Sequence, residues 1–266
     1  MAFTDEDEEE SAKPRRLGII LGACAAFAVG IMGIGYLTTG SPFFISQRWT
    51  ADDVDRLLLE DADTGALYRA VKAGYPEEYR AFLGNAAAEA SEGRSSAIEG
   101  AARQFARSLI ARHFNGVTRA PTPILLDIAR QMALMIEAAR RADIRLCAPS
   151  TVDSMPESAR PADALAIGVR METLLIRAAS MGERGSRAMR PALTPEETLA
   201  LRAAAARRSP EAAAVIADPR PMRAATLAQQ CATILAIYQA IADLPPDEGA
   251  TALVGLLRQG YEPGAP

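Results

Sequence analysis

The stretch MRAATLAQQCATILAIYQAIADL, residues 222–244, decides the fold, because it is the most apolar helical pattern in the body of the chain. Its large residues recur three and four positions apart, a spacing that places them on one face of an α-helix. They are Leu227, Cys231, Ile234, Leu235, Tyr238 and Ile241. Pro245 and Pro246 end this helix, and Pro246 is well placed to start another that runs to about Gln259. A helix that is this apolar predicts a core made of helices.

The same periodicity continues toward the N-terminus, and no stretch alternates in the manner of a strand. Helix starts are indicated by a polar capping residue or a first-position proline at Thr50, Pro76, Thr122, Pro161 and Thr194. We therefore expect an all-α fold of roughly eight to ten helices over residues 50–260, arranged as a multi-helix bundle or as stacked helical hairpins. Residues 261–266 are expected to form a flexible C-terminus.

Residues 17–37, LGIILGACAAFAVGIMGIGYL, carry no charge. At about 1.5 Å per residue they span about 31 Å as a helix, which matches a bilayer core. Two alternatives are a cleaved signal peptide and a lipoprotein signal cut before Cys24. Signal peptides have shorter apolar stretches, and this one continues well past Cys24. We interpret it as a single N-terminal transmembrane helix, with a juxtamembrane linker at 38–49.

Basic residues flank this segment unevenly, which predicts its orientation. Lys13, Arg15 and Arg16 precede it, whereas the first base after it is Arg48. The acidic tail at 1–16, expected to be disordered, should therefore be cytoplasmic, and residues 50–260 should be periplasmic, anchored in a bacterial inner membrane. Amphipathic aromatic residues are expected at the outer interface, namely Tyr36, Phe43, Phe44 and Trp49.

Four small residues lie four positions apart within the predicted span: Gly18, Gly22, Ala26 and Gly30. They share one helix face, where small side chains let two helices approach closely. This favours a homo-oligomer or a membrane or periplasmic protein partner. The alternative is that glycine and alanine are simply common in membrane helices.

Cys147 and Cys231 are both expected to face an oxidising compartment, while Cys24 falls within the predicted span. We predict a disulfide that joins the middle of the body to its most apolar helix. The alternative is a pair of buried thiols that pack as small hydrophobes. Without Cys-x-x-Cys, a redox enzyme is not indicated.

Residues that commonly carry catalysis or bind metals are sparse. His113 is the single histidine, so neither a zinc site nor a catalytic triad is indicated, and we expect it near a helix C-terminus. Adjacent carboxylates at 52–53 and 196–197 fall in first helical turns, where capping explains them better than glycoside chemistry. Arg184, Arg187 and Arg190 are interpreted as a solvated loop, with binding of lipid phosphates or an acidic partner as the alternative. We expect no metal, cofactor or catalytic residue.

The net charge of the chain is −4, much of it in the N-terminal tail. A body that is nearly neutral argues against nucleic-acid binding through phosphate contacts. We therefore expect a membrane-anchored, non-catalytic interaction or scaffold protein of the cell envelope. The alternatives are a membrane-tethered envelope hydrolase and a periplasmic sensor of a small ligand.

Overall fold

Helices make up most of the described part of the chain, which comprises residues 48–148, 162–218 and 220–261 of the computed structural model and contains no strand. The predicted all-α class is confirmed. The α-helices are α2 (Ala51–Glu60), α3 (Gly65–Gly74), α4 (Pro76–Glu89), α5 (Ile98–Arg112), α6 (Phe114–Val117), α7 (Thr122–Ala142), α8 (Ala162–Arg184), α9 (Pro195–Ala206), α10 (Pro210–Ala217), α11 (Arg220–Ala224), α12 (Leu227–Asp243) and α13 (Pro246–Tyr261).

The predicted helix starts at Thr50 and Thr194 are confirmed, and both form a complete capping box. The Thr50 hydroxyl accepts from the Asp53 backbone N–H, and the Asp53 carboxylate accepts from the Thr50 backbone N–H. Thr194 and Glu197 make the same reciprocal pair at the start of α9. The acidic residues in these first turns therefore satisfy backbone donors that the helix itself leaves unpaired.

The long helix expected over residues 222–244 is divided in two. The short α11 ends at Ala224, and α12 begins at Leu227 after Thr226, whose extended backbone and side chain form a third capping box with Gln229. The Gln230 side chain donates to the carbonyl of Ala225 across the break, at 3.0 Å. The sequence pattern Thr-x-x-Gln contains this signal, but the unbroken run of apolar residues hides it.

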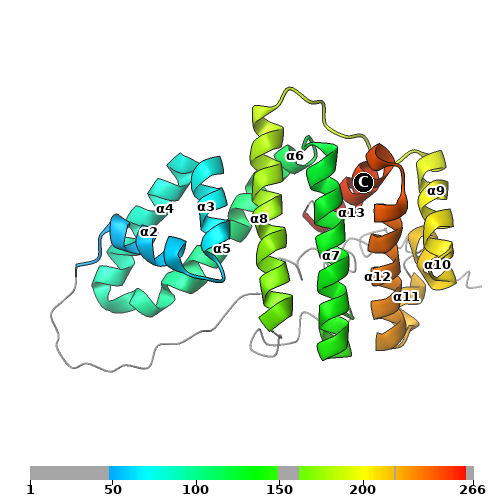
Figure 1. Cartoon of the computed structure of the whole chain (residues 1–266), viewed down its shortest axis with the longest axis horizontal. Helices are drawn as coiled ribbons and strands as arrows, with labels where there is room; N and C mark the ends of the chain where they lie inside the picture. Colours follow the sequence, from blue (N-terminus) through cyan, green and yellow to red (C-terminus); the bar gives the residue numbers. More distant parts are fainter. Residues whose placement is uncertain (1–47, 149–161, 219, 262–266) are drawn as a thin grey trace, which may run out of the picture.

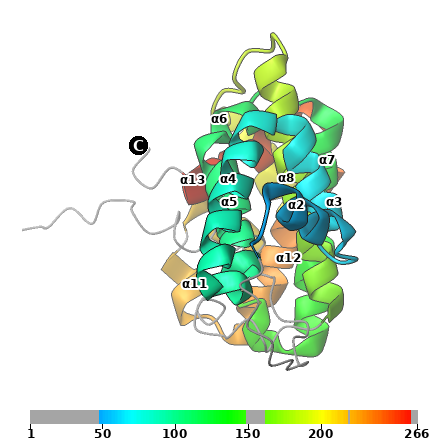
Figure 2. The same cartoon turned by 90° about the vertical axis from the view of Figure 1, so that its left-hand side faces the viewer.

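Two groups of helices make up the described structure. Helices α8, α7 and α12 stand side by side, with α9 and α10 beyond α12 at one end of the long axis (Figure 1). Helix α13 packs against α7, α12 and α9. At the opposite end, α2 to α5 form a smaller group that joins the rest through contacts of α3 and α5 with α8 (Figure 2).

The junction of α6 and α8 brings two backbones into direct contact at Gly116 and Gly182. A Cβ atom at either glycine would collide with carbonyl groups of the other helix. Gly116 directly follows the helical pattern of residues 95–115, a position that predicts the end of that helix. Instead α5 ends at Arg112, and Gly116 lies inside α6, where the close approach of α8 requires the absence of a side chain.

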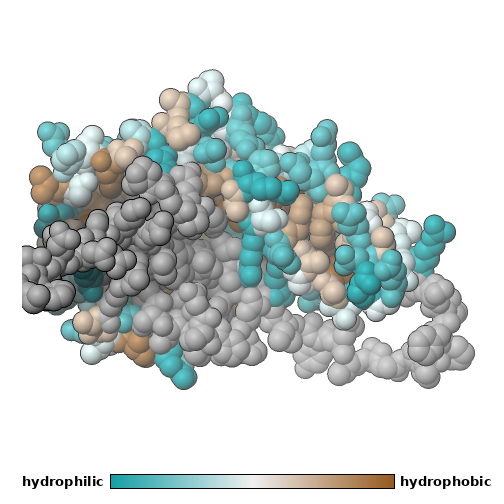
Figure 3. Space-filling model, turned by 180° about the vertical axis from the view of Figure 1, so that it is seen from behind, coloured by the Kyte–Doolittle hydropathy of each residue, from teal (hydrophilic) through white to brown (hydrophobic). Residues whose placement is uncertain are grey.

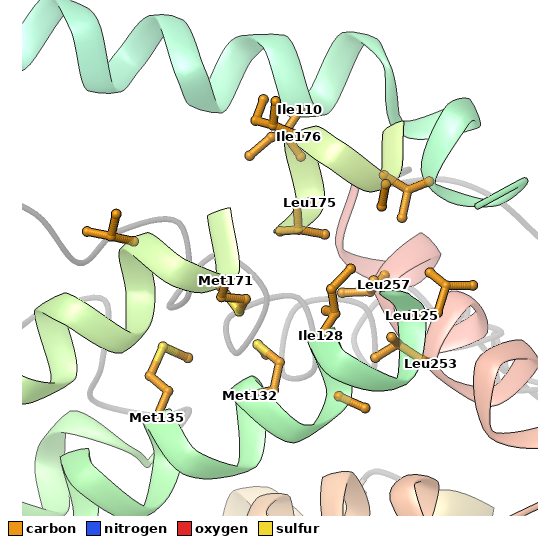
Figure 4. Close-up of a cluster of buried hydrophobic side chains, with 14 of the residues drawn as sticks. Ile110, Leu125, Ile128, Met132, Met135, Met171, Leu175, Ile176, Leu253 and Leu257 are labelled. Atoms are coloured by element: carbon orange, nitrogen blue, oxygen red, sulfur yellow. The ribbon is translucent and has the colours of Figure 1, made fainter. Parts of the chain in front are cut away.

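The hydrophobic core lies between α5, α7, α8 and α13 and continues toward α12. Figure 4 shows its centre, where long aliphatic and methionine side chains from these helices meet. Six side chains there are fully buried, namely Met132, Met135, Met171, Ile110, Ile128 and Ile176. The helix α7 is enclosed by α8 and α12, and its apolar residues at the spacing of one helix face are buried. They are Ile124, Ile128, Met132, Met135, Ile136 and Ala139.

No helix within the described residues is long and apolar enough to cross a membrane. The predicted span at 17–37, the tail at 1–16, most of the linker at 38–49 and nearly all of the C-terminal segment at 261–266 lie outside the described residues. So do Lys13, Arg15, Arg16, the small-residue set from Gly18 to Gly30, Tyr36, Phe43 and Phe44.

Candidate docking groove

An open groove of about 310 Å³ lies between α4 and α5. Each helix contributes residues at positions i, i+3, i+4 and i+7, so a single face of each helix forms one wall. The wall on α4 consists of Phe82, Asn85, Ala86 and Glu89, and the wall on α5 consists of Ala101, Gln104, Phe105 and Ser108. We call these eight residues the α4–α5 groove.

The two helices form a hairpin, and the turn between them shapes the groove. After Glu89 the chain makes a single π-turn over Ala90–Arg94 and a short 3-10 turn over Ser95–Ala97. Gly93 has a φ of 91°, which a residue with a side chain rarely adopts, so glycine permits the reversal. The neighbouring faces of α4 and α5 are buried, through Tyr79 and Leu83 on α4 and Ala102 and Ala106 on α5.

Two phenylalanines close one end of the α4–α5 groove. The rings of Phe82 and Phe105 stack with centroids 4.5 Å apart and planes 9° from parallel. Both rings are only partly buried. Phe105 lies at the edge of the buried face of α5, where it meets Phe82 of α4. The exposed edges of both rings therefore offer an apolar surface to another molecule.

The floor of the groove is small and apolar, and its rim is largely uncharged. Ala86 is buried and Ala101 is half-buried, whereas Asn85, Gln104 and Ser108 are exposed. Glu89 is the one ionisable residue among the eight. On this end of the molecule, at the right of Figure 3, hydrophobic residues lie in a strip that hydrophilic residues border. Such a surface accepts an apolar side chain flanked by polar groups.

A polar cluster around His113 lies beyond the phenylalanine end of the groove. His113 caps the C-terminus of α5, as expected. Its Nδ1 atom lies 2.7 Å from Oε1 of Glu183 on α8, and its Nε2 atom lies 3.3 Å from Oε1 of Glu78 on α4. Its ring lies 4.2 Å from that of Tyr75. The cluster therefore joins α4, α5 and α8 and holds one end of the α4–α5 hairpin in place.

Burial raises the pKa of Tyr75 above its ordinary value, and the neighbouring Glu183 carboxylate raises it further. The other tyrosines and acids with clearly shifted pKa values lie in the core or at helix caps and turns, outside the α4–α5 groove. Within the described residues, no group of acidic, histidine or cysteine side chains is arranged to hold a metal ion.

A second open cavity, of about 490 Å³, lies where α7 and α13 begin. The Arg190 guanidinium donates to the Thr122 hydroxyl at 2.6 Å beside it, and Thr122 in turn donates to Asp247. Arg190 was expected in a solvated loop. Its side chain is instead only 16% exposed, because it lies against the starts of both helices. Its charge is paired with Asp247, 3.7 Å away, so this cavity is not an open cationic site.

The predicted disulfide between Cys147 and Cys231 is confirmed. Their Cα atoms lie 5.3 Å apart, and both residues are buried, with exposed fractions of 2% and 0%. The bond joins the segment that follows α7 to the core face of α12. Trp49 is half-buried and packs against the core, and its backbone N–H donates to the Ser91 hydroxyl at 2.9 Å. Its expected position at a membrane interface stays a prediction.

No protein-family model, no curated protein and no solved structure matches this chain. The α4–α5 groove, the disulfide and the His113 cluster therefore carry the functional inference. Sequence reasoning missed the groove, although the spacing of Phe82, Asn85, Ala86 and Glu89 contains one wall of it. A wall becomes a groove only when a second helix lies beside it.

Proposed function

We propose that this chain is a membrane-anchored scaffold protein of the bacterial cell envelope, whose periplasmic helical domain binds a protein partner through the α4–α5 groove. The groove is the observation that carries this proposal. It combines a stacked aromatic end, a small apolar floor and a largely uncharged rim on a helical hairpin. Protein interfaces are typically apolar and aromatic at the centre and polar at the rim.

The proposed compartment is supported by the disulfide, because disulfides persist in oxidising compartments such as the periplasm. The predicted span at 17–37 and the bases at Lys13, Arg15 and Arg16 supply the anchor and the orientation of this proposal. An enclosed apolar cavity would favour a small-ligand sensor instead, but both cavities described above are open. A hydrolase would be favoured by several groups with shifted pKa values gathered in one pocket, whereas the acids whose pKa is lowered lie at helix caps and turns away from the groove.

A photo-crosslinking amino acid at Asn85, in the full-length chain in cell membranes, tests the docking role. We expect specific protein adducts from this exposed rim position and none from a matched probe at Arg140, on the exposed face of α7 and outside both cavities. Adducts at both positions, or at neither, would contradict a role for the groove.

Topology is tested separately with a single introduced cysteine. Ala62→Cys lies at an exposed position in the turn between α2 and α3. A membrane-impermeant maleimide should label it in cells whose outer membrane is permeabilised and whose inner membrane is intact. Labelling that requires rupture of the inner membrane would show that the domain is cytoplasmic.

A further inference from the structure

Leu199 on α9 is the most exposed large hydrophobic side chain in the described part of the chain, at 60%. Helix α9 lies at one end of the long axis of the molecule, and α4 and α5 lie at the other (Figure 1). Leu199 shares the outer face of α9 with Glu196 and Ala203, three residues before it and four after it. An isolated leucine that projects from a helix has the form of a knob for a hole between two other helices.

The α4–α5 groove has the form of such a hole. Ala86 and Ala101 leave space between the two helices, and the stacked rings of Phe82 and Phe105 close one end. A leucine that enters over the two alanines contacts the edges of both rings. No side chain of the described structure fills this space, because the groove is open to solvent.

Charge complementarity gives the contact a direction. Glu89 lies three residues after Ala86 on α4, and Arg202 lies three residues after Leu199 on α9. Residues three apart on a helix are neighbours on one face. When Leu199 lies over Ala86, with the two helices running the same way, Arg202 therefore faces Glu89. Glu89 is exposed and Arg202 is half-buried, and within the described part of the chain no salt bridge is found for either charge.

We propose that Leu199 of one copy inserts into the α4–α5 groove of a second copy, with Arg202 beside Glu89, and so joins copies head to tail. This inference rests on the proposed function, since it names the occupant of the groove. The two surfaces differ and lie at opposite ends of the molecule, so the contact is heterologous. Such contacts propagate into rows unless the rotation between copies closes a ring.

A single leucine and one ion pair at the rim make a weak contact between free molecules. Anchoring in one membrane confines the copies and raises their effective concentration, which favours a contact that dilute solution does not. We therefore expect rows in membranes and monomers in dilute detergent. Assembly that depends on the density of copies in the membrane is suited to a scaffold protein.

The test uses the full-length chain in membranes, with a photo-crosslinking residue at Asn85 on the groove rim. Irradiation should give a ladder of dimer, trimer and larger products, and mass spectrometry should place the crosslinks on α9. Leu199→Glu should abolish the ladder. Leu134→Glu, at another exposed leucine on α7 (53% exposed), is the matched control and should leave the ladder unchanged. Electrophoresis without reductant checks that each variant still forms the Cys147–Cys231 disulfide.

A mixing experiment separates a head-to-tail contact from a symmetric one. Gln104→Arg blocks the groove at an exposed position and leaves Leu199 intact, whereas Leu199→Glu leaves the groove intact. Neither variant should crosslink alone. Together, with the probe on the Leu199→Glu copy, they should give a heterodimer and no trimer. Reversing both charges, Glu89→Arg with Arg202→Glu, should restore crosslinking that either change alone weakens.

Three results would overturn the inference. A ladder that survives Leu199→Glu would place self-association on another surface. Adducts with a different protein and none with this chain would leave the proposed function standing and remove the second copy as occupant. A probe at Asn85 that captures nothing would overturn both.

Discussion

Removing the Cys147–Cys231 disulfide should lower the free energy of unfolding substantially. The two residues are 84 positions apart, so the bond closes a long loop in the unfolded chain. In the chain-entropy treatment such a loop corresponds to about 4.6 kcal/mol at 25 °C, an upper figure, and native disulfides typically contribute about 2 to 5 kcal/mol. Alanine removes one sulfur atom at each site, which leaves only a small void at each of these buried positions. We expect Cys147→Ala with Cys231→Ala to cost about 2 to 4 kcal/mol.

Urea unfolding of the full-length protein in detergent, followed by far-UV circular dichroism, measures this loss. A Cys24→Ala background keeps the third thiol from exchanging with the pair. Reductant should lower the unfolding midpoint of the background protein to that of the double variant and should not affect the double variant itself. A loss below about 0.5 kcal/mol, or equal sensitivity of both proteins to reductant, would refute the loop-closure reasoning.

Three further outcomes follow from the packing and the caps. Gly182→Ala should destabilise the protein by about 1 to 3 kcal/mol, because the added Cβ collides with the α6 backbone. Gly100→Ala meets nothing within 4 Å and should stabilise the protein by up to about 1 kcal/mol. Thermal unfolding of both variants measures the difference. Hydrogen bonds from Thr50 hold the pKa of Asp53 below 3.8. The capping contribution of Asp53 to stability is therefore complete above about pH 4 and is lost as the pH falls. The difference in melting temperature between the natural protein and the Asp53→Asn variant should vanish in acid. Burial raises three tyrosine pKa values above 10, so absorbance at alkaline pH should show these side chains ionising only on unfolding: Tyr68, Tyr75 and Tyr79.

The helix boundaries that sequence reasoning predicted correctly are those with a local cause. Thr50 and Thr194 start helices because their side chains satisfy backbone donors three residues away, an interaction that needs no distant contact. Gly116 was misinterpreted because its role depends on α8, which is distant in the sequence. A glycine that ends a helix and a glycine that admits a second backbone have the same local sequence signal.

The sequence allowed the pairing of Cys147 with Cys231 to be predicted, but not the distance and packing that bring the two residues together. The topology inferred from residues 13–48 made pairing of Cys147 with Cys231 reasonable, and the 5.3 Å between their Cα atoms is set by the packing of α12 beside the end of α7. The membrane span that motivated the prediction lies outside the described residues, so the compartment stays a proposal.

By itself, the sequence determined that this protein is built from helices and where the helices with a local start signal begin, such as those at Thr50 and Thr194. These properties follow from a repeat of 3.6 residues and from capping interactions within a single turn. Only the tertiary structure decided which helices become neighbours. The α4–α5 groove, the contact of Gly116 with Gly182 and the placement of α9 at the far end of the molecule all depend on it. Pairing of helix faces is a property of the whole chain, because any apolar face can be buried by many others, and the best joint packing selects one arrangement.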